Sequence, residues 1–156
     1  MAYTYEPIAT QTVSGVSSVS FTSIPSTYTD LKVVFSGYND APLMYINYNG
    51  STSGYSTTFV GGNGSVAASA RYGSPWLYVW APGAGTYFNL SVDVMSYANT
   101  ARWKSWICKG YITDNSGGPT LWVGTWASTA AINRVDIFTS SLTMSGNFTI
   151  YGIKAA

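Results

Sequence analysis

The stretch Val16–Gly37 constrains the fold more than any other part of the chain. Within Val16–Phe21 and again within Leu31–Gly37, apolar side chains occupy alternate positions, with serine or lysine between most of them. A period of two residues is typical of a β-strand with one buried face. Pro25 lies between the two segments, lacks an amide hydrogen and restricts the preceding residue to extended conformations, so the first strand ends before it. Two strands joined by such an arch favour a β-sandwich, in which the chain often crosses from one sheet to the other.

The composition of the chain agrees with a single all-β domain. Its 156 residues suffice for one sizeable core, and 16% of them are aromatic whereas only 8% are charged. Aromatic and β-branched residues pack well on pleated surfaces, and a helical protein would instead show a 3.6-residue period. Alternating segments recur at roughly 8–12-residue spacing, which predicts a single antiparallel β-sandwich of about nine or ten strands.

Individual segments differ in how clearly they predict structure. The clearest strand is Phe88–Met95, whereas Val66–Tyr72 is ambiguous. Asn49-Gly50 opens a loop with the strongest short hairpin signal. The inward faces of the sheets are expected to bury a set of large apolar side chains, and truncating one of them should cost a few kcal/mol. The predicted core residues are Phe21, Phe35, Leu90, Val92, Val135, Ile137 and Ile150.

The N-terminal residues 1–13 are extended but do not alternate like the interior strands. Pro7 in this segment suggests either an edge strand of the protein's own sheet or an arm that adds to the sheet of a neighbour. The chain therefore divides into residues 1–13, an N-terminal extended segment, and residues 14–156, the β-sandwich domain. The candidate docking residues of an arm are Tyr3, Tyr5, Pro7 and Ile8.

The charge balance excludes some partners and suggests others. Seven basic and six acidic residues give a net charge of +1, and the basic residues are scattered, so we expect no nucleic-acid binding. The chain has no basic segment followed by an apolar run and no stretch of about 18 apolar residues, so we expect neither a secretory signal nor a membrane span. So little charge leaves two alternatives: either partners cover part of the aromatic surface, or serine, threonine and asparagine alone keep it soluble.

The chemistry-bearing residues predict no enzyme. The chain has no histidine, which excludes His-based catalytic triads and zinc sites, and its six carboxylates are dispersed, most of them at or near turns. Cys108 is the lone cysteine, so it forms no internal disulfide and is expected to be a small buried hydrophobe. We therefore assign no catalytic, cofactor-binding or metal-binding residue.

A compact aromatic strand between two prolines offers a candidate contact surface. Its candidate contact stripe consists of Trp76, Tyr78 and Trp80. Packing in a core or against another subunit is the default role of such a stripe, and stacking on a sugar is the alternative.

Five segments, at both ends and in part of the middle of the chain, carry a family resemblance: Tyr5–Thr10, Ser20–Leu31, Asn49–Ser56, Trp126–Val135 and Gly152–Lys154. They resemble a family of small virion proteins of tailed bacteriophages, particularly phages of aquatic bacteria and cyanobacteria. Arg71–Tyr111 falls outside the resemblance.

The resemblance implies a jelly-roll-like sandwich and a structural role without catalysis. It implies a capsid cement (decoration) protein that binds the major capsid protein and copies of itself, located in the virion after assembly in the host cytoplasm. The alternative is a tail-fibre or baseplate domain that binds a host receptor or glycan. The local three-fold axes of a capsid lattice make a trimer the first expectation for the oligomer, with a dimer next.

Overall fold

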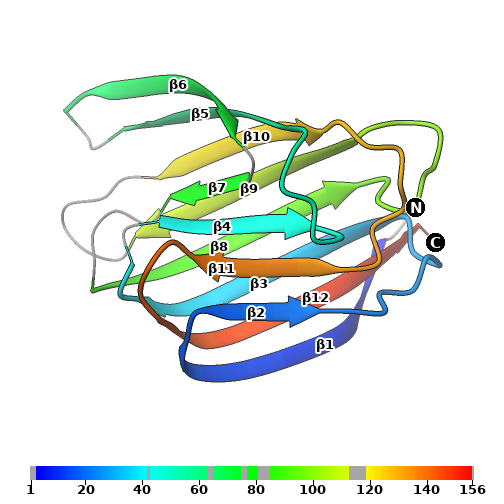
Figure 1. The fold of residues 1–156 in the computed structure, drawn as a ribbon, viewed down its shortest axis with the longest axis horizontal. Helices are drawn as coiled ribbons and strands as arrows, with labels where there is room; N and C mark the ends of the chain where they lie inside the picture. The colour runs from blue at the N-terminus through cyan, green and yellow to red at the C-terminus, as the bar shows by residue number, and fades with distance from the viewer. Residues whose placement is uncertain are drawn as a thin grey trace.

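The described structure consists of two antiparallel sheets that face each other (Figure 1). No helix occurs in the part of the chain that the structure describes, and therefore none there could cross a membrane. The predicted all-β sandwich is confirmed. The computed structural model describes residues 3–41, 43–62, 65–74, 77–80, 85–112 and 119–155.

The two sheets differ in size. The larger sheet has the strand order β1 (Tyr3–Val16), β12 (Met144–Ala155), β3 (Asp30–Asn39), β8 (Thr86–Met95), β9 (Lys104–Ile112), β10 (Thr120–Trp126), β5 (Tyr55–Gly62) and β6 (Ala67–Ser74). The smaller sheet has the order β2 (Ser18–Phe21), β11 (Val135–Thr139), β4 (Leu43–Tyr48) and β7 (Leu77–Trp80).

The chain alternates between the sheets as it proceeds. Strands β2, β4, β7 and β11 lie in the smaller sheet, and the strands that precede and follow each of them lie in the larger one. This connectivity is that of an eight-stranded jelly roll, in which β1, β12, β3 and β8 face β2, β11, β4 and β7, and the larger sheet is extended beyond β8 by β9, β10, β5 and β6. The hairpin β9–β10 is inserted between β8 and β5, so the larger sheet extends beyond the smaller one.

The stretch Val16–Gly37 folds as its alternation predicts. Strands β2 and β3 lie in different sheets, and the alternating apolar residues of both are buried in the interface between them. The connection between the strands is fixed to neighbouring loops: the Ile24 amide donates to the Asn133 carbonyl at 3.0 Å, and the Tyr97 hydroxyl donates to the Pro25 carbonyl. The arch therefore joins the sheets at one end of the sandwich.

The predicted core is confirmed. Each of its seven members is less than 10% exposed, and all belong to one hydrophobic cluster between the sheets. Phe35 organises the centre of this cluster, because its ring stacks on Phe148 at 3.9 Å and meets Phe88 edge-on at 4.5 Å between centroids. Aromatic pairs of this kind add stability beyond the area that they bury.

The described part of the chain contains twelve strands, more than the nine or ten expected. One of the additional strands is β6, whose alanines and serine lack the alternation that identifies a strand. The Asn49-Gly50 turn also differs from its simplest interpretation. Both residues have positive φ, 53° and 67°, as a hairpin turn requires, but strand β4 before the turn pairs with β11 and β7, and β5 after it lies in the other sheet.

Candidate binding face

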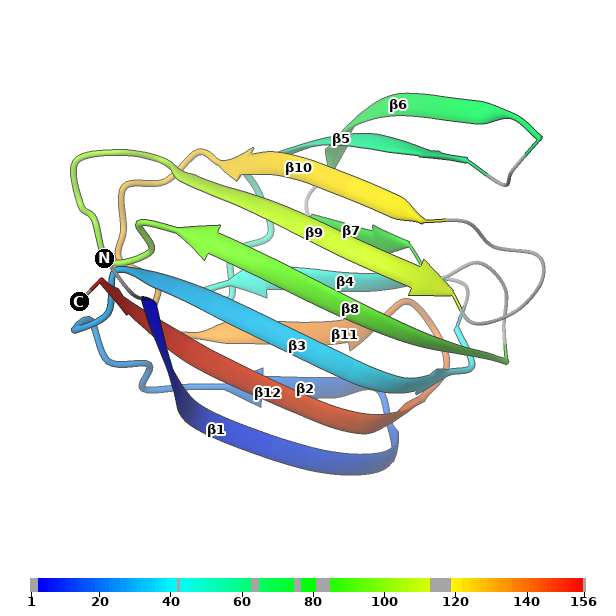
Figure 2. The same cartoon turned by 180° about the vertical axis from the view of Figure 1, so that it is seen from behind.

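The larger sheet has one face against the smaller sheet and one face turned away from it. Seen from behind, strands β12, β3, β8, β9 and β10 cross the view with no other described element in front of them (Figure 2). We call this side the outer face. Its side chains alternate with buried ones along each strand, as in β8, where every second residue from Thr86 to Val94 is buried.

Apolar side chains gather on the outer face where β5, β10, β9 and β8 lie side by side. Val60 is 54% exposed, and Leu121, its partner across the strands, is 38% exposed. Val123 and Met95 are 37% and 40% exposed, and Ile107, half-buried, pairs with Val123. We call these five side chains the outer apolar patch. A contiguous exposed group of this kind on a sheet is typical of an interaction surface.

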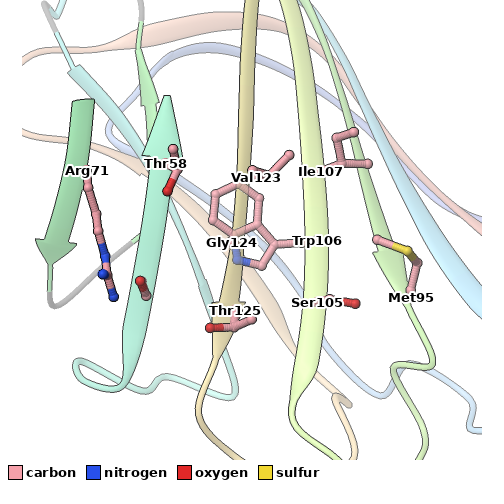
Figure 3. A pocket seen from close by; sticks show the side chains of 10 residues that line it. Thr58, Arg71, Met95, Ser105, Trp106, Ile107, Val123, Gly124 and Thr125 are labelled. Carbon is pink, nitrogen blue, oxygen red and sulfur yellow. The ribbon is translucent and has the colours of Figure 1, made fainter. Parts of the chain in front are cut away.

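A shallow depression of about 500 Å³ crosses this region (Figure 3). Val123, Ile107 and Met95 line one side of it, and Arg71 and Thr58 line the other. The remaining polar lining consists of hydroxyl groups, so the depression combines an apolar wall, neutral hydrogen-bonding groups and a single cation. Such a mixture suits an apolar side chain of a partner with polar groups around it.

The shape of the depression depends on Gly124, which belongs to the inward-facing row of β10 together with Trp122 and Trp126. A Cβ atom at Gly124 would lie 2.1 Å from the Ser56 carbonyl oxygen and 2.5 Å from the Trp106 ring. The missing side chain therefore lets Trp106 lie beneath β10, where it is 1% exposed. The floor of the depression rests on this packed ring.

Three charged side chains on the outer face form one ion-pair network beside the patch. The Asp93 carboxylate accepts from the Lys32 ammonium at 2.7 Å, and the Lys109 ammonium lies 3.4 Å from its other oxygen. These three residues lie on β3, β8 and β9. Since the cations share one carboxylate, this ion-pair network fixes the adjoining strands without placing a concentrated charge on the face.

The sequence did not identify the outer apolar patch as a candidate site. Both alternating sets of Thr120–Trp126 are apolar, so a period of two cannot decide which set faces inward. The available signal was size: the tryptophans of this strand are the larger side chains, and the structure buries them while Leu121 and Val123 face outward. The larger size of the tryptophans could therefore have assigned Leu121 and Val123 to the outer face of β10.

The candidate arm residues lie in β1, which forms the edge of the larger sheet next to β12. The strand extends to Val16, past residue 13, and its pairing begins with Tyr3 opposite Ala155. Tyr5 is 53% exposed, and the Lys32 ammonium lies 5.9 Å from its ring centroid. Ile8 is half-buried against the core. Within this single chain the segment pairs with β12 as an edge strand, and its role as an arm toward a neighbour stays a prediction.

The candidate aromatic stripe is only partly within the described residues. Trp76 lies outside them, and Tyr78 and Trp80 are described by their backbone alone. Their strand, β7, is the edge of the smaller sheet, with Tyr78 opposite Tyr45 and Trp80 opposite Leu43. Tyr78 and Trp80 therefore belong to a different sheet from the outer apolar patch.

The described carboxylates have structural partners. Asp30 accepts from the Ser96 amide at 2.6 Å, Asp40 from the Thr143 hydroxyl at 2.8 Å, and Asp136 from Arg134 at 2.8 Å. Asp93 belongs to the network above, Glu6 pairs with Lys154 at 3.1 Å, and Asp114 lies outside the described residues. Within the described part of the chain no group of three His, Cys, Asp or Glu residues could hold a metal ion.

Buried ionisable groups support the fold. Burial raises the pKa of the Cys108 thiol to about 12, and it raises the pKa of Tyr55 to about 12 as well, although a hydrogen bond to the Tyr48 amide partly opposes the second shift. The Lys104 ammonium is buried, which lowers its pKa, and it donates to the carbonyls of Asn99, Arg102 and Thr129. The inert thiol and the bound ammonium are suited to structural roles.

Comparison of the chain with protein-family models, with curated proteins and with solved structures finds no match.

Proposed function

We propose that this protein is a non-enzymatic structural protein of a bacteriophage virion, a capsid cement protein that binds the head shell. The observation that carries the proposal is the outer apolar patch, which lies in the middle of a sheet face that no described element covers. The resemblance to small virion proteins supplies the context in which such a face would be covered.

The exposed side chains of the outer apolar patch favour association with a partner. Apolar surface gains roughly 25 cal/mol for each Å² that leaves water, so covering several half-exposed aliphatic side chains favours association. Interface cores are also depleted in charge, and the patch itself contains no ionisable side chain. The nearby cations and hydroxyl groups can form the polar rim that interfaces place around an apolar centre.

The partners proposed are copies of the chain itself and the major capsid protein. In a closed oligomer each copy presents the same patch, and a trimer would match a local three-fold axis of a capsid lattice, with a dimer as the next choice. The free edge of β1 would then remain for the capsid subunit, with Tyr5 and Pro7 exposed along it. The proposed location is the virion.

The absence of catalysis is part of the same proposal. The described carboxylates are engaged in ion pairs or hydrogen bonds that fix strands and turns, and Cys108 is fully buried. A protein that works by assembly requires a rigid scaffold and an exposed face, and the jelly roll supplies both.

Imaging of labelled protein on phage particles tests this proposal. Label over the head shell is the expected result, label at the tail supports the tail-fibre alternative, and particles without label contradict both. Val123→Glu should weaken the label, because a carboxylate in the centre of the interface between copies loses its hydration and separated copies bind the shell singly, without avidity. Leu142→Glu is the matched control, since Leu142 is 49% exposed in the turn between β11 and β12 and lies outside the patch.

A further inference from the structure

A second depression lies on the outer face, over β12, β3 and β8. Its volume is about 570 Å³, and neutral side chains supply its polar lining. The side chains that concern us are Ser36, Tyr38, Tyr87, Asn89, Ser145 and Asn147.

The sheet register arranges these side chains in two parallel rows. One row consists of Ser145, Tyr38 and Tyr87, which are opposite one another on β12, β3 and β8. The other row is offset by two residues on each strand and consists of Asn147, Ser36 and Asn89. Because side chains two residues apart on a strand share a face, an aromatic row lies directly beside an amide and hydroxyl row.

The aromatic row provides a flat apolar surface. Tyr87 is 65% exposed, and its ring lies 5.0 Å from the Tyr38 ring at an interplanar angle of 60°. The two rings thus support each other at a fixed angle, and one remains largely open to solvent. A ring fixed in this way can receive a flat apolar ligand surface at little entropic cost.

The neighbouring strand β1 orients one side chain of each row, Asn147 in the polar row and Ser145 in the aromatic row. The Thr12 hydroxyl donates to the Asn147 amide oxygen at 2.7 Å, so the nitrogen of this side chain remains to donate to a ligand. The Gly15 amide donates to the Ser145 hydroxyl oxygen at 2.9 Å, which leaves the hydroxyl hydrogen for an acceptor. Asn89 and Ser36 are exposed and add an amide and a hydroxyl.

The close approach of two glycines keeps this region rigid. Gly146 has a φ of 147°, and a Cβ atom there would lie 2.4 Å from the Ser36 carbonyl oxygen. Its partner Gly37 is equally confined, with the Ser145 carbonyl oxygen 2.2 Å from the position of a Cβ atom. Any side chain at either position would force β3 and β12 apart and separate the rows.

The chemistry of the depression selects against charged ligands. None of the described lining residues carries a formal charge, and Lys32 and Asp93, further along β3 and β8, neutralise each other at 2.7 Å. Asp40 follows Tyr38 by two residues but is not in the lining, and its carboxylate accepts from the Thr143 hydroxyl at 2.8 Å. Within the lining a phosphate or carboxylate would lack a cationic partner, and an ammonium would lack an anionic one. A ligand that fits is neutral, has many hydroxyl groups and has one apolar face.

We propose that this depression is a binding subsite for a neutral carbohydrate. The C–H face of a pyranose ring would stack on Tyr87, and neighbouring sugar hydroxyls would bond the amides of Asn89 and Asn147. Amide groups suit this task because each can donate and accept at once. The subsite lies apart from the outer apolar patch and does not depend on the proposed cement function.

Titration with a panel of neutral oligosaccharides built from glucose, galactose, mannose and N-acetylglucosamine, followed by NMR shifts of the protein, tests the proposal. We expect at least one neutral sugar to bind and to shift the signals of Tyr87 and Asn89. Tyr87→Ala should weaken that binding by roughly tenfold or more, since it removes the stacking surface. Trp103→Ala is the matched control, because Trp103 is similarly exposed, at 63%, but lies outside the subsite.

The outcomes separate this proposal from the cement function. Binding that Tyr87→Ala weakens and Trp103→Ala leaves unchanged supports the subsite. No binding by any neutral sugar, binding only of charged sugars or of peptides from the partner, or equal binding by Tyr87→Ala overturns it. An unchanged melting temperature of Tyr87→Ala shows that the variant is folded, and its labelling of particles reports on the cement function alone.

Discussion

The two faces of the larger sheet use the same strands for opposite purposes. On β8, Leu90 is 7% exposed and packs in the core, whereas Tyr87 and Met95 on the other face are 65% and 40% exposed. On β10, Trp122 is buried at 4% exposure and its neighbour Val123 is open to solvent at 37%. Within a single strand, one alternating set of side chains thus packs in the core, and the other set lies on the surface that a partner can contact. Substitutions on the inner face should therefore change stability, and substitutions on the outer face should change association.

The largest effect is expected for Leu90→Ala on the inner face. Leu90 fills the space that Gly110 leaves open, because a Cβ atom at Gly110 would lie 2.3 Å from the Leu90 side chain. Truncation creates a cavity there and should lower the free energy of unfolding by about 2–5 kcal/mol. Chemical denaturation measures this change. Val123→Ala, on the outer face, is the comparison, and equal losses in the two variants would contradict the assignment of faces.

Gly124→Ala should have the next largest effect, although it adds only one methyl group. The new Cβ atom would meet the Ser56 carbonyl oxygen and the Trp106 ring, and the carbonyl belongs to the backbone of β5 and moves only with the strand. Overpacking of this kind costs about 1–3 kcal/mol. A thermal melt compares the variant with Gly73→Ala, where a Cβ atom has open space within 4 Å. Equal melting temperatures of the two variants would contradict the close approach of β10 and β5 at Gly124.

Alkaline pH should lower the free energy of unfolding, because buried groups of the core resist deprotonation. Burial raises the pKa of Cys108 from 9.0 to about 12 and of Tyr55 from 10.0 to about 12, and Tyr48 shifts in the same direction. Above about pH 9 the unfolded chain loses protons that the folded chain retains, so stability falls as pH rises. The pKa of Lys104 is lowered in the folded state, so this group makes stability rise with pH. It opposes three groups whose pKa values shift upward, and the net change is therefore a loss of stability.

The pH dependence is measured as the melting temperature between pH 7 and pH 11. Cys108→Ala should show a smaller decrease than the parent protein above pH 9, because the variant has no thiol to titrate. A melting temperature of the parent that stays constant or rises through this range would contradict the burial of these groups.

Deletion of residues 2–7 is expected to have a smaller effect. It removes the pairing of β1 with β12 between Tyr3 and Pro7, at the edge of the sheet, and leaves the rest of β1 in place. A loss of about 1 kcal/mol would lower the melting temperature by roughly 2–4 °C in a domain of this size. An unchanged melting temperature together with weaker binding to particles would indicate that the segment works as an arm instead. In the control variant, residues 2–7 are replaced by a glycine-serine sequence of the same length.

The sequence predicted the fold class, the inward faces of β3, β8 and β11 and the crossing between β2 and β3, because one alternating set of each strand is clearly more apolar. It could not predict the strand order or the pairing partners of Asn49-Gly50. That turn has hairpin geometry, yet its Asn49 side chain bonds the Asn133 and Arg134 amides and fixes the turn to the loop before β11. Long-range contacts of this kind leave no local pattern.

The two depressions were also beyond prediction from the sequence. The two rows that contain Tyr87 and Asn89 form only when β12, β3 and β8 pair in one particular register. The spacing of these residues along the chain does not indicate that register. The outer apolar patch likewise depends on which set of β10 side chains faces outward. Residue types alone suggested instead the aromatic stripe around Tyr78.

The most direct test of the separation between faces measures mass and melting temperature together for Val123→Glu and the parent protein. The account predicts that the parent scatters light as an oligomer at low micromolar concentration and that Val123→Glu scatters as a monomer. It also predicts that the free energy of unfolding of Val123→Glu differs by less than about 1 kcal/mol from that of the parent protein diluted until it is monomeric. Lys109 lies on the adjacent strand β9, and Arg71 lies one strand beyond β5 and lines the same depression, so both cations moderate the effect of the new carboxylate. Equal masses for the two proteins, or a monomer that is strongly destabilised, would contradict the account.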